Sequence, residues 1–183
     1  VIGHSRQANV GAVSLANTHP FMREMWGRNW CFAHNGQLAD FAPQLGMYQP
    51  VGDTDSEAAF CDMLNRLRAA CSSECGIEQL LPVIVAACNE YRSKGVFNCL
   101  LSNGDWLFSY CTTKLAHITR RAPFGPATLK DADMSVDFQS ETTPNDVVTV
   151  LATEPLTDNE RWTVYAPGEW RLWRNGETVA QGC

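Results

Sequence analysis

The stretch DTDSEAAFCDMLNRL, residues 53–67, predicts a helix and the point at which it begins. Thr54 and Glu57 have the spacing of an N-cap residue and its capping-box partner three positions later. Apolar side chains then recur at the i, i+3, i+4, i+7 spacing of one helical face: Phe60, Met63, Leu64 and Leu67. We therefore expect a helix that starts after Thr54 and buries this apolar face.

A second helical pattern follows and ends at a stop signal. Its apolar positions again share one face: Ile77, Leu80, Leu81, Ile84, Cys88 and Tyr91. Pro82 has no N–H to donate, so the pattern places it in or near the first turn. Lys94-Gly95 supplies a cation for the last turn and a glycine beyond it, which predicts the end of the helix.

Around these helices the sequence has the pattern of strands. Residues 30–33 form a short apolar run that ends in Asn35-Gly36, a turn signal. The runs predicted to be strands further on are 96–101 and 106–110 around Asn103-Gly104, 147–152, and 170–173 and 177–180 around Asn175-Gly176. Residues 123–145 have the least regular pattern. The order of elements predicts a mixed α+β fold, and no internal boundary divides the chain.

Composition and charge exclude several classes of protein. The 183 residues are 45% hydrophobic, which supports one domain with a core of its own. The net charge is −6 and the longest basic run is Arg120-Arg121, so we expect no nucleic-acid binding. No apolar run is long enough to span a bilayer, so we expect no membrane segment.

The eight cysteines do not form a compact disulfide framework. Several occupy apolar helix or strand positions, where a free cysteine acts as a small hydrophobe. Cys71 and Cys75 are four residues apart, with no second pair to complete a zinc site. We therefore predict reduced thiols and a cytoplasmic location.

Several polar motifs occur in a fixed order along the chain. They are GHSRQANVG at 3–11, NTHPF at 17–21, His34-Asn35-Gly36, DTDSE at 53–57, ATEPL at 152–156 and PGE at 167–169. In this order they resemble the class II glutamine amidotransferases over essentially the whole chain. The resemblance is strongest to small standalone bacterial members, which are similar to γ-glutamyl hydrolases of glutathione and ergothioneine metabolism.

The resemblance implies a fold and a reaction. The fold is that of the N-terminal-nucleophile hydrolases, a four-layer αββα sandwich of two antiparallel sheets between helices. The reaction is hydrolysis of the γ-amide of glutamine or a γ-glutamyl compound through a thioester on an N-terminal cysteine. Since Val1 supplies no thiol, residues 1–183 are expected to be a single domain that lacks its nucleophile segment.

The resemblance also assigns the site. Arg6 and Asn9 would bind the α-carboxylate, Asp55 the α-ammonium, and Asn35 and Gly36 would form the oxyanion hole. The chemistry fits, because a guanidinium forks onto a carboxylate and two N–H donors can converge on an oxyanion. Gln7 and Asn9-Val10 depart from the family pattern, which bears on substrate preference.

Each assignment has a structural alternative. Arg6 could form an ordinary surface ion pair. The acidic residues at 53, 55 and 57 could simply stabilise the start of a helix. Asn35-Gly36 could be a plain hairpin turn, as we expect for Asn103-Gly104 and Asn175-Gly176.

A metal-binding role for the histidines is less well supported by the sequence than a structural role. His4, His19 and His34 are separated by fifteen residues each, which fits no helical ligand spacing, and each belongs to one of the motifs. We predict a structural role for them, and neither a metal nor a cofactor.

The partners expected are glutamine or a γ-glutamyl small molecule. The chain ends at Cys183 without a second domain to receive ammonia, so a transferase would need an acceptor protein. The alternative is a non-catalytic glutamine-binding or partner-binding domain without a nucleophile. The oligomeric state is not predicted.

Overall fold

The computed structural model describes residues 1–5, 14–132, 134–137 and 143–183. A short 3₁₀ turn, Leu15–Asn17, precedes the first hairpin, β1 (Phe21–Met25) and β2 (Arg28–Leu38). Helices α1 (Asp55–Ala70) and α2 (Ile77–Tyr91) follow, and a 3₁₀ turn at Arg92–Lys94 leads into the next strand. Both predicted helices are present.

The larger sheet is antiparallel, with strand order β1-β2-β3-β4-β10-β11. The strands not yet bounded are β3 (Gly95–Ser102), β4 (Leu107–Tyr110), β10 (Trp170–Arg174) and β11 (Glu177–Gly182). Asn103-Gly104 and Asn175-Gly176 join hairpins, as predicted. At the second of these turns φ is positive at both residues, which matches the twist of the hairpin.

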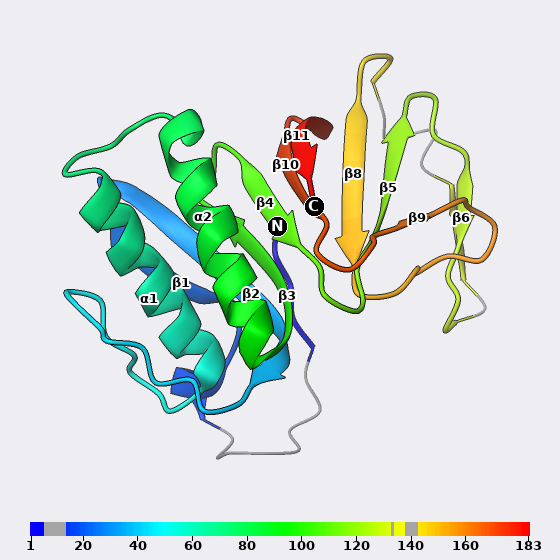
Figure 1. Cartoon of the computed structure of the whole chain (residues 1–183). Coiled ribbons are helices and arrows are strands. Elements are labelled where there is room, and N and C mark those ends of the chain that lie inside the picture. Colours follow the sequence, from blue (N-terminus) through cyan, green and yellow to red (C-terminus); the bar gives the residue numbers. More distant parts are fainter. Residues whose placement is uncertain (6–13, 133, 138–142) are drawn as a thin grey trace.

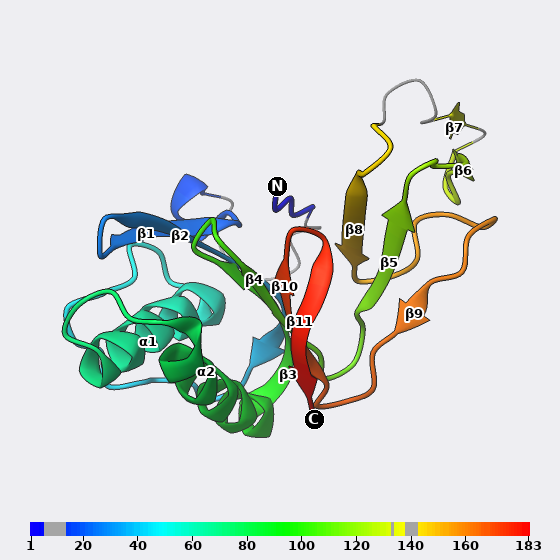
Figure 2. The same ribbon diagram turned by 90° about the horizontal axis from the view of Figure 1, so that it is seen from above.

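The smaller sheet has strand order β8-β5-β9. Its strands are β5 (Ala116–Arg121), β8 (Val147–Ala152) and β9 (Thr163–Val164), while β6 (Pro126–Thr128) and β7 (Ser135–Asp137) form a separate ribbon. Helices α1 and α2 cover one face of the larger sheet, and the smaller sheet lies on the other side (Figures 1 and 2). The described residues thus supply one helix layer and two sheet layers of an α+β fold.

The main core lies between the helices and the larger sheet. The predicted apolar face of α1 is fully buried there, with Phe60, Met63, Leu64 and Leu67 at most 1% exposed. Phe60 stacks on Phe32 of β2 with ring centroids 5.2 Å apart. Burial of side chains of this size contributes roughly 1.5–3 kcal/mol each, so this face alone fixes α1 against β2.

Pro82 lies near the first turn of α2, as predicted, but not within it. The helix begins at Ile77, so Pro82 is in its second turn and not in the first. A proline there leaves the carbonyl four residues earlier without its helical donor. The buried face of α2, which includes Leu80, Ile84, Cys88 and Tyr91, holds the helix in place despite this loss.

The prediction of fully reduced thiols is wrong for one pair. Cys71 and Cys75, in the connection between α1 and α2, form a disulfide, and the other six cysteines are free. This pairing removes part of the support for a cytoplasmic location. No helix in the described part of the chain is long and apolar enough to cross a membrane.

Thiol titration tests this pairing. The denatured, unreduced protein should react as six thiols per chain, and eight after reduction. A Cys71→Ser/Cys75→Ser double variant, as the control, should give the same count in both states. Eight reactive thiols in the unreduced wild type would show that the two cysteines are not bonded to each other.

Candidate active site

The start of α1 is bonded to the last residues of β2. Thr54 caps the helix by accepting the N–H of Glu57 at 3.2 Å. The next two side chains reach across to β2: Asp55 Oδ2 accepts the N–H of Leu38 at 2.7 Å, and Ser56 Oγ lies 2.8 Å from Nδ1 of His34. The helix start and the strand end therefore form one rigid unit.

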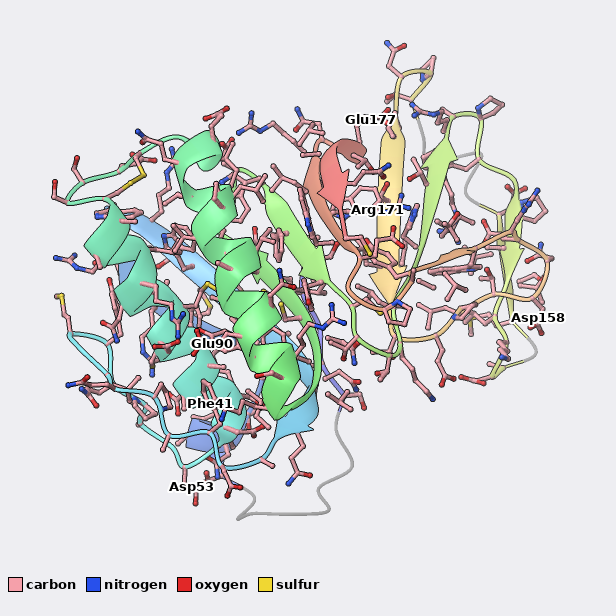
Figure 3. The ribbon with its side chains drawn as sticks, viewed as in Figure 1. Phe41, Asp53, Glu90, Asp158, Arg171 and Glu177 are labelled. Carbon is pink, nitrogen blue, oxygen red and sulfur yellow. A yellow bond between two sulfur atoms is a disulfide. The ribbon has the colours of Figure 1, made fainter. Side chains whose placement is uncertain are left out.

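Two neighbouring carboxylates also have partners within the protein, Glu57 through both oxygens and Asp53 through one. Glu57 is 1% exposed, accepts the N–H groups of Val51 and Gly52 and pairs with Arg23. It takes these donors in place of the N–H of Thr54, so only half of the predicted capping box forms. Asp53, at the lower end of α1 in Figure 3, accepts from the side chain of Asn17.

Asp55 differs from these two carboxylates in being bonded to β2. One of its oxygens is held by Leu38, and the other has no hydrogen-bond partner among residues that the structure describes. Asp55 is also only partly buried. Its second oxygen is therefore available to an external cation beside β2, whereas the exposed carboxylate of Asp53, which is also bonded through one oxygen only, lies next to Asn17.

Asn35-Gly36 does not form a turn. The expected short strand at 30–33 extends to Leu38, and β2 pairs with β3 in continuous register, with Asn35 opposite Asn98 and Gly36 opposite Phe97. Pairing along β3 outweighs the local turn preference of the dipeptide. The hairpin-turn alternative for Asn35-Gly36 is wrong.

The direction of the Gly36 N–H follows from the hydrogen-bond pattern between the antiparallel strands β2 and β3. In an antiparallel pair, backbone N–H groups along one strand point alternately toward and away from the partner. The N–H of Leu38 points away from β3, to Asp55, while that of Ala39 bonds to Lys94 on the β3 side. Gly36, two residues before Leu38, therefore also directs its N–H away from β3.

Asp55 and the Gly36 N–H consequently lie on the same side of β2. Two residues span about 7 Å along a strand, comparable with the reach of an extended glutamyl group. On this side β1 pairs only with residues 28–32, so no strand of the described chain covers β2 at Gly36.

Glycine is required at position 36 for a reason that the sequence did not reveal. Its φ is 151°, and a Cβ at this position would lie 1.9 Å from the carbonyl oxygen of Val96. Glycine allows β2 and β3 to approach each other here.

The side chain of Asn35 points to the opposite face from that of His34, because side chains alternate along a strand. There it lines a cavity of about 320 Å³ together with Ser5, Asn98, Leu115 and residues of β8. Gly36 and Asp55 do not line this cavity. Arg6 and Asn9 lie outside the described residues, although Ser5, next to Arg6, shares the cavity with Asn35.

The histidines of the motifs make ring contacts and hydrogen bonds within the protein, and His4 and His34 line the same cavity. The rings of His4 and His19 stack with centroids 4.4 Å apart, while His34 is bonded to Ser56 and Val96. The described ranges contain no group of three or more His, Cys, Asp or Glu side chains that could hold a metal.

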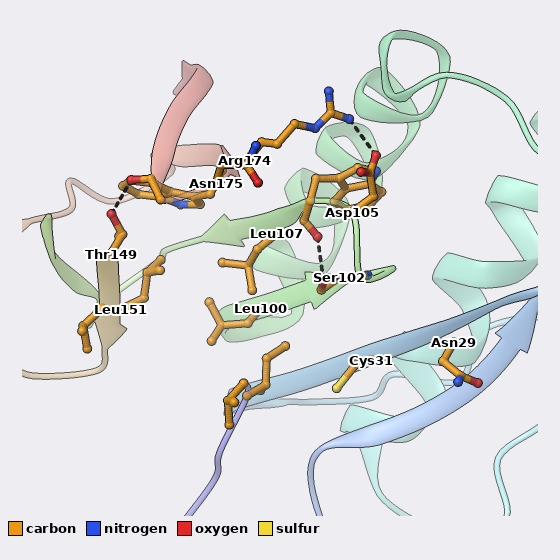
Figure 4. A pocket seen from close by; sticks show the side chains of 17 residues that line it. Asn29, Cys31, Leu100, Ser102, Asp105, Leu107, Thr149, Leu151, Arg174 and Asn175 are labelled. Atoms are coloured by element: carbon orange, nitrogen blue, oxygen red, sulfur yellow. Dashed lines mark hydrogen bonds and ion pairs between the residues drawn. The ribbon is translucent and has the colours of Figure 1, made fainter. Parts of the chain in front are cut away.

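A second, larger cavity of about 630 Å³ lies between the two sheets (Figure 4). It is lined by Cys31, Leu100 and Leu107 of the larger sheet, by Thr149 and Leu151 of β8, and by Val1 and Ile2. Of the predicted site residues that the structure describes, neither Asn35, Gly36 nor Asp55 lines it.

His34 is held neutral. Its Nε2 donates to the carbonyl of Val96 at 3.1 Å, so Nδ1 accepts the hydroxyl hydrogen of Ser56. Burial lowers the pKa of His34, and the hydrogen bond to Val96 and the charge of Asp55 oppose this only in part. A neutral ring one residue before Asn35 keeps this part of the strand uncharged.

His117, on β5, was not identified from the sequence. It is 8% exposed and packs against Tyr165 and Trp173, and neither ring nitrogen has a hydrogen-bond partner among the described residues. Burial, and then the charge of Arg171 (labelled in Figure 3), lower the pKa of His117. A lone histidine in a strand carries no sequence signal that would mark it.

Solved structures define the class of this fold. A structure titled as a predicted glutamine amidotransferase from Pseudomonas aeruginosa PA01 is 68% identical, with a TM-score of 0.88 over 96% of this chain and 69% of that chain. The Bacillus subtilis glutamine phosphoribosylpyrophosphate amidotransferase, complexed with ADP and GMP, has a TM-score of 0.50 at 12% identity, over 93% of this chain and 32% of that chain, and shows the fold alone. The fold is the α+β fold of the N-terminal-nucleophile class.

The family follows from sequence. The model of the class-II glutamine amidotransferases matches residues 1–183, and the chain belongs to this family. It is 55% identical to the Escherichia coli K12 protein named "Putative glutamine amidotransferase YafJ", over 98% of this chain and 71% of that protein. A Haemophilus influenzae protein, "Putative glutamine amidotransferase", is 41% identical over 99% of this chain and 62% of its own length.

The two neutral histidines predict how stability depends on pH. Because burial lowers the pKa of both His34 and His117 below about 6.5, the unfolded chain binds protons first as the pH falls. The free energy of unfolding should therefore decrease below pH 6.5, by up to about 1.4 kcal/mol per pH unit for each group.

Urea unfolding of wild type and His117→Phe between pH 7.5 and 5 measures this effect. The phenylalanine ring keeps the packing on Trp173 and cannot bind a proton, so the variant should lose less stability on acidification. Equal losses in the two proteins would show that His117 does not contribute.

Proposed function

We propose that the complete protein hydrolyses the γ-amide of glutamine or of a γ-glutamyl compound. The nucleophile would be an N-terminal cysteine outside residues 1–183, which form a single catalytic domain without it. The observation that carries the proposal is the shared direction of the Asp55 carboxylate and the Gly36 N–H on one side of β2.

The glutamyl group would lie along this side of β2. Its α-ammonium would bind the free oxygen of Asp55, and its δ-carbonyl oxygen would face the Gly36 N–H and the Asn35 amide. The α-carboxylate would bind Arg6 and Asn9, assigned from the family motif. If both donors converge on the developing oxyanion, as this proposal requires, they favour the transition state over the ground state.

The reaction then proceeds in two halves. The thiolate attacks the δ-carbon, the oxyanion forms at the donors of Asn35 and Gly36, and its collapse expels ammonia or an amine that takes up a proton. The α-amino group of the same cysteine would accept and return protons. Water then attacks the thioester, releasing glutamate and regenerating the thiol.

The internal cysteines are poorly suited to this role. Burial raises the pKa of Cys61 and of Cys111 to about 11, and it also raises the pKa of Cys31 and Cys88. A nucleophilic cysteine requires the opposite shift. This supports a nucleophile outside the chain.

Hydrolysis and transfer to an acceptor share this first half-reaction. A hydrolase would release ammonia to solvent, and a transferase would pass it to an acceptor protein. Ammonia and glutamate release from glutamine, glutathione and other γ-glutamyl compounds, measured on the complete protein, would identify the substrate.

Asn35→Ala in the complete protein tests the oxyanion donor. Loss of one such donor should lower kcat about 10²- to 10³-fold. Asn103→Ala is the matched control, because it alters an Asn-Gly pair in a hairpin turn and should leave kcat unchanged. A wild-type kcat in the Asn35 variant would exclude its amide from the oxyanion hole.

Asp55→Asn tests the ammonium ligand. The new amide keeps an oxygen for the N–H of Leu38, so the fold is retained, but it loses the charge that binds the ammonium. The glutamine KM should rise about 10- to 100-fold, as expected for a charged hydrogen bond.

Asp53→Asn, whose wild-type carboxylate bonds to Asn17, should leave KM unchanged. An unchanged KM in the Asp55 variant would remove this residue from the site. Binding of glutamine without release of glutamate by the complete wild-type protein would favour the non-catalytic alternative.

A further inference from the structure

Asn98 of β3 is directly opposite Asn35 and is 3% exposed. Its Nδ2 donates to the main-chain carbonyl of Asn35 at 2.9 Å and to Oγ1 of Thr113 at 3.0 Å. It also lies 3.5 Å from Oδ1 of Asn35, at the limit of hydrogen bonding. A buried amide thus uses both of its donor hydrogens beside the proposed oxyanion residue.

The side-chain oxygen of Asn98 binds a different segment of the chain. Oδ1 of Asn98 accepts the main-chain N–H groups of Thr112, Thr113 and Lys114, at 2.9, 2.9 and 3.2 Å. These residues connect β4 of the larger sheet to β5 of the smaller sheet. The next residue, Leu115, lines the cavity that contains Asn35.

The contact with Asn35 bears on the Gly36 N–H. The carbonyl of Asn35 and the N–H of Gly36 belong to one planar, trans peptide unit, in which they point in opposite directions. A donor that holds the carbonyl on the β3 side therefore holds the N–H on the open side of β2. The same hydrogen bond polarises the peptide and makes its N–H a stronger donor.

We propose that Asn98 is a positioning residue for the oxyanion hole, acting through the peptide between Asn35 and Gly36. This inference rests on the proposed function. Asn98 touches neither substrate nor nucleophile in this account. Its effect should appear in kcat, because the oxyanion exists only after attack, while the glutamine KM depends mainly on groups that bind the α-carbon substituents.

Asn98→Asp in the complete protein removes the hydrogen-bond donor of the Asn98 side chain and keeps its acceptor. The carboxylate still accepts the three N–H groups, which keep it ionised, but it cannot donate to Asn35. We expect kcat to fall about tenfold, the size of effect of one hydrogen bond, with the KM for glutamine within about twofold of wild type. The thermal midpoint of unfolding should stay near that of the wild type.

Thr113→Val is the matched control, because it removes the second acceptor of Nδ2 and leaves the contact with Asn35. Its kcat should equal that of the wild type. If Asn98→Asp does not fold, Asn98→Thr, which suits a strand and lacks the amide, should show the same loss of kcat at constant KM.

A wild-type kcat in the folded Asn98 variant, or an equal loss of kcat in Thr113→Val, would overturn the inference and leave the proposed function intact. If the complete wild-type protein releases no glutamate from glutamine or any γ-glutamyl compound, the proposed function fails, and this inference fails with it.

Discussion

The hydrogen bond from the Leu38 N–H to Asp55 is the constraint on which the site depends. It joins Asp55, the first residue of α1, to Leu38, the last residue of β2. A second hydrogen bond, between Ser56 of α1 and His34 of β2, joins the same two elements four residues earlier along the strand. The bond between Leu38 and Asp55 also fixes the backbone direction at Gly36, since N–H groups alternate along the strand. Without it, the carboxylate and the glycine N–H would be independent of each other.

Contacts on two sides hold the orientation of the peptide between Asn35 and Gly36. From the helix side, the neutral ring of His34, the residue before Asn35, donates to the carbonyl of Val96. A side chain at Gly36 would collide with the same carbonyl of Val96. From the other side, the amide of Asn98 holds the carbonyl of Asn35. Such a peptide is preorganised, which is the property that makes an oxyanion donor effective, because little reorganisation is needed during the reaction.

Local sequence signals correctly predicted elements whose structure depends on neighbouring residues. They failed where contacts between residues far apart in the sequence determine the structure. Thr54 and the apolar face of α1 gave the helix correctly, because capping and periodicity act within a few residues. Asn35-Gly36 carries a local turn signal, which made a hairpin turn the alternative to the oxyanion hole, because its pairing with β3, more than sixty residues away, has no local signature. The Cys71–Cys75 disulfide was missed for lack of a framework, and Asn98 because a single amide in a strand is unremarkable in sequence. The order of the motifs identified the family, but not the direction of any N–H.

A crystal structure of the complete protein with L-glutamate bound would test the central claim most directly. The account predicts that the α-ammonium lies within hydrogen-bond distance of the free oxygen of Asp55, and that a γ-carboxylate oxygen faces both the Gly36 N–H and the Asn35 amide. Glutamate bound elsewhere, or bound here with its γ-carboxylate turned away from β2, would contradict it.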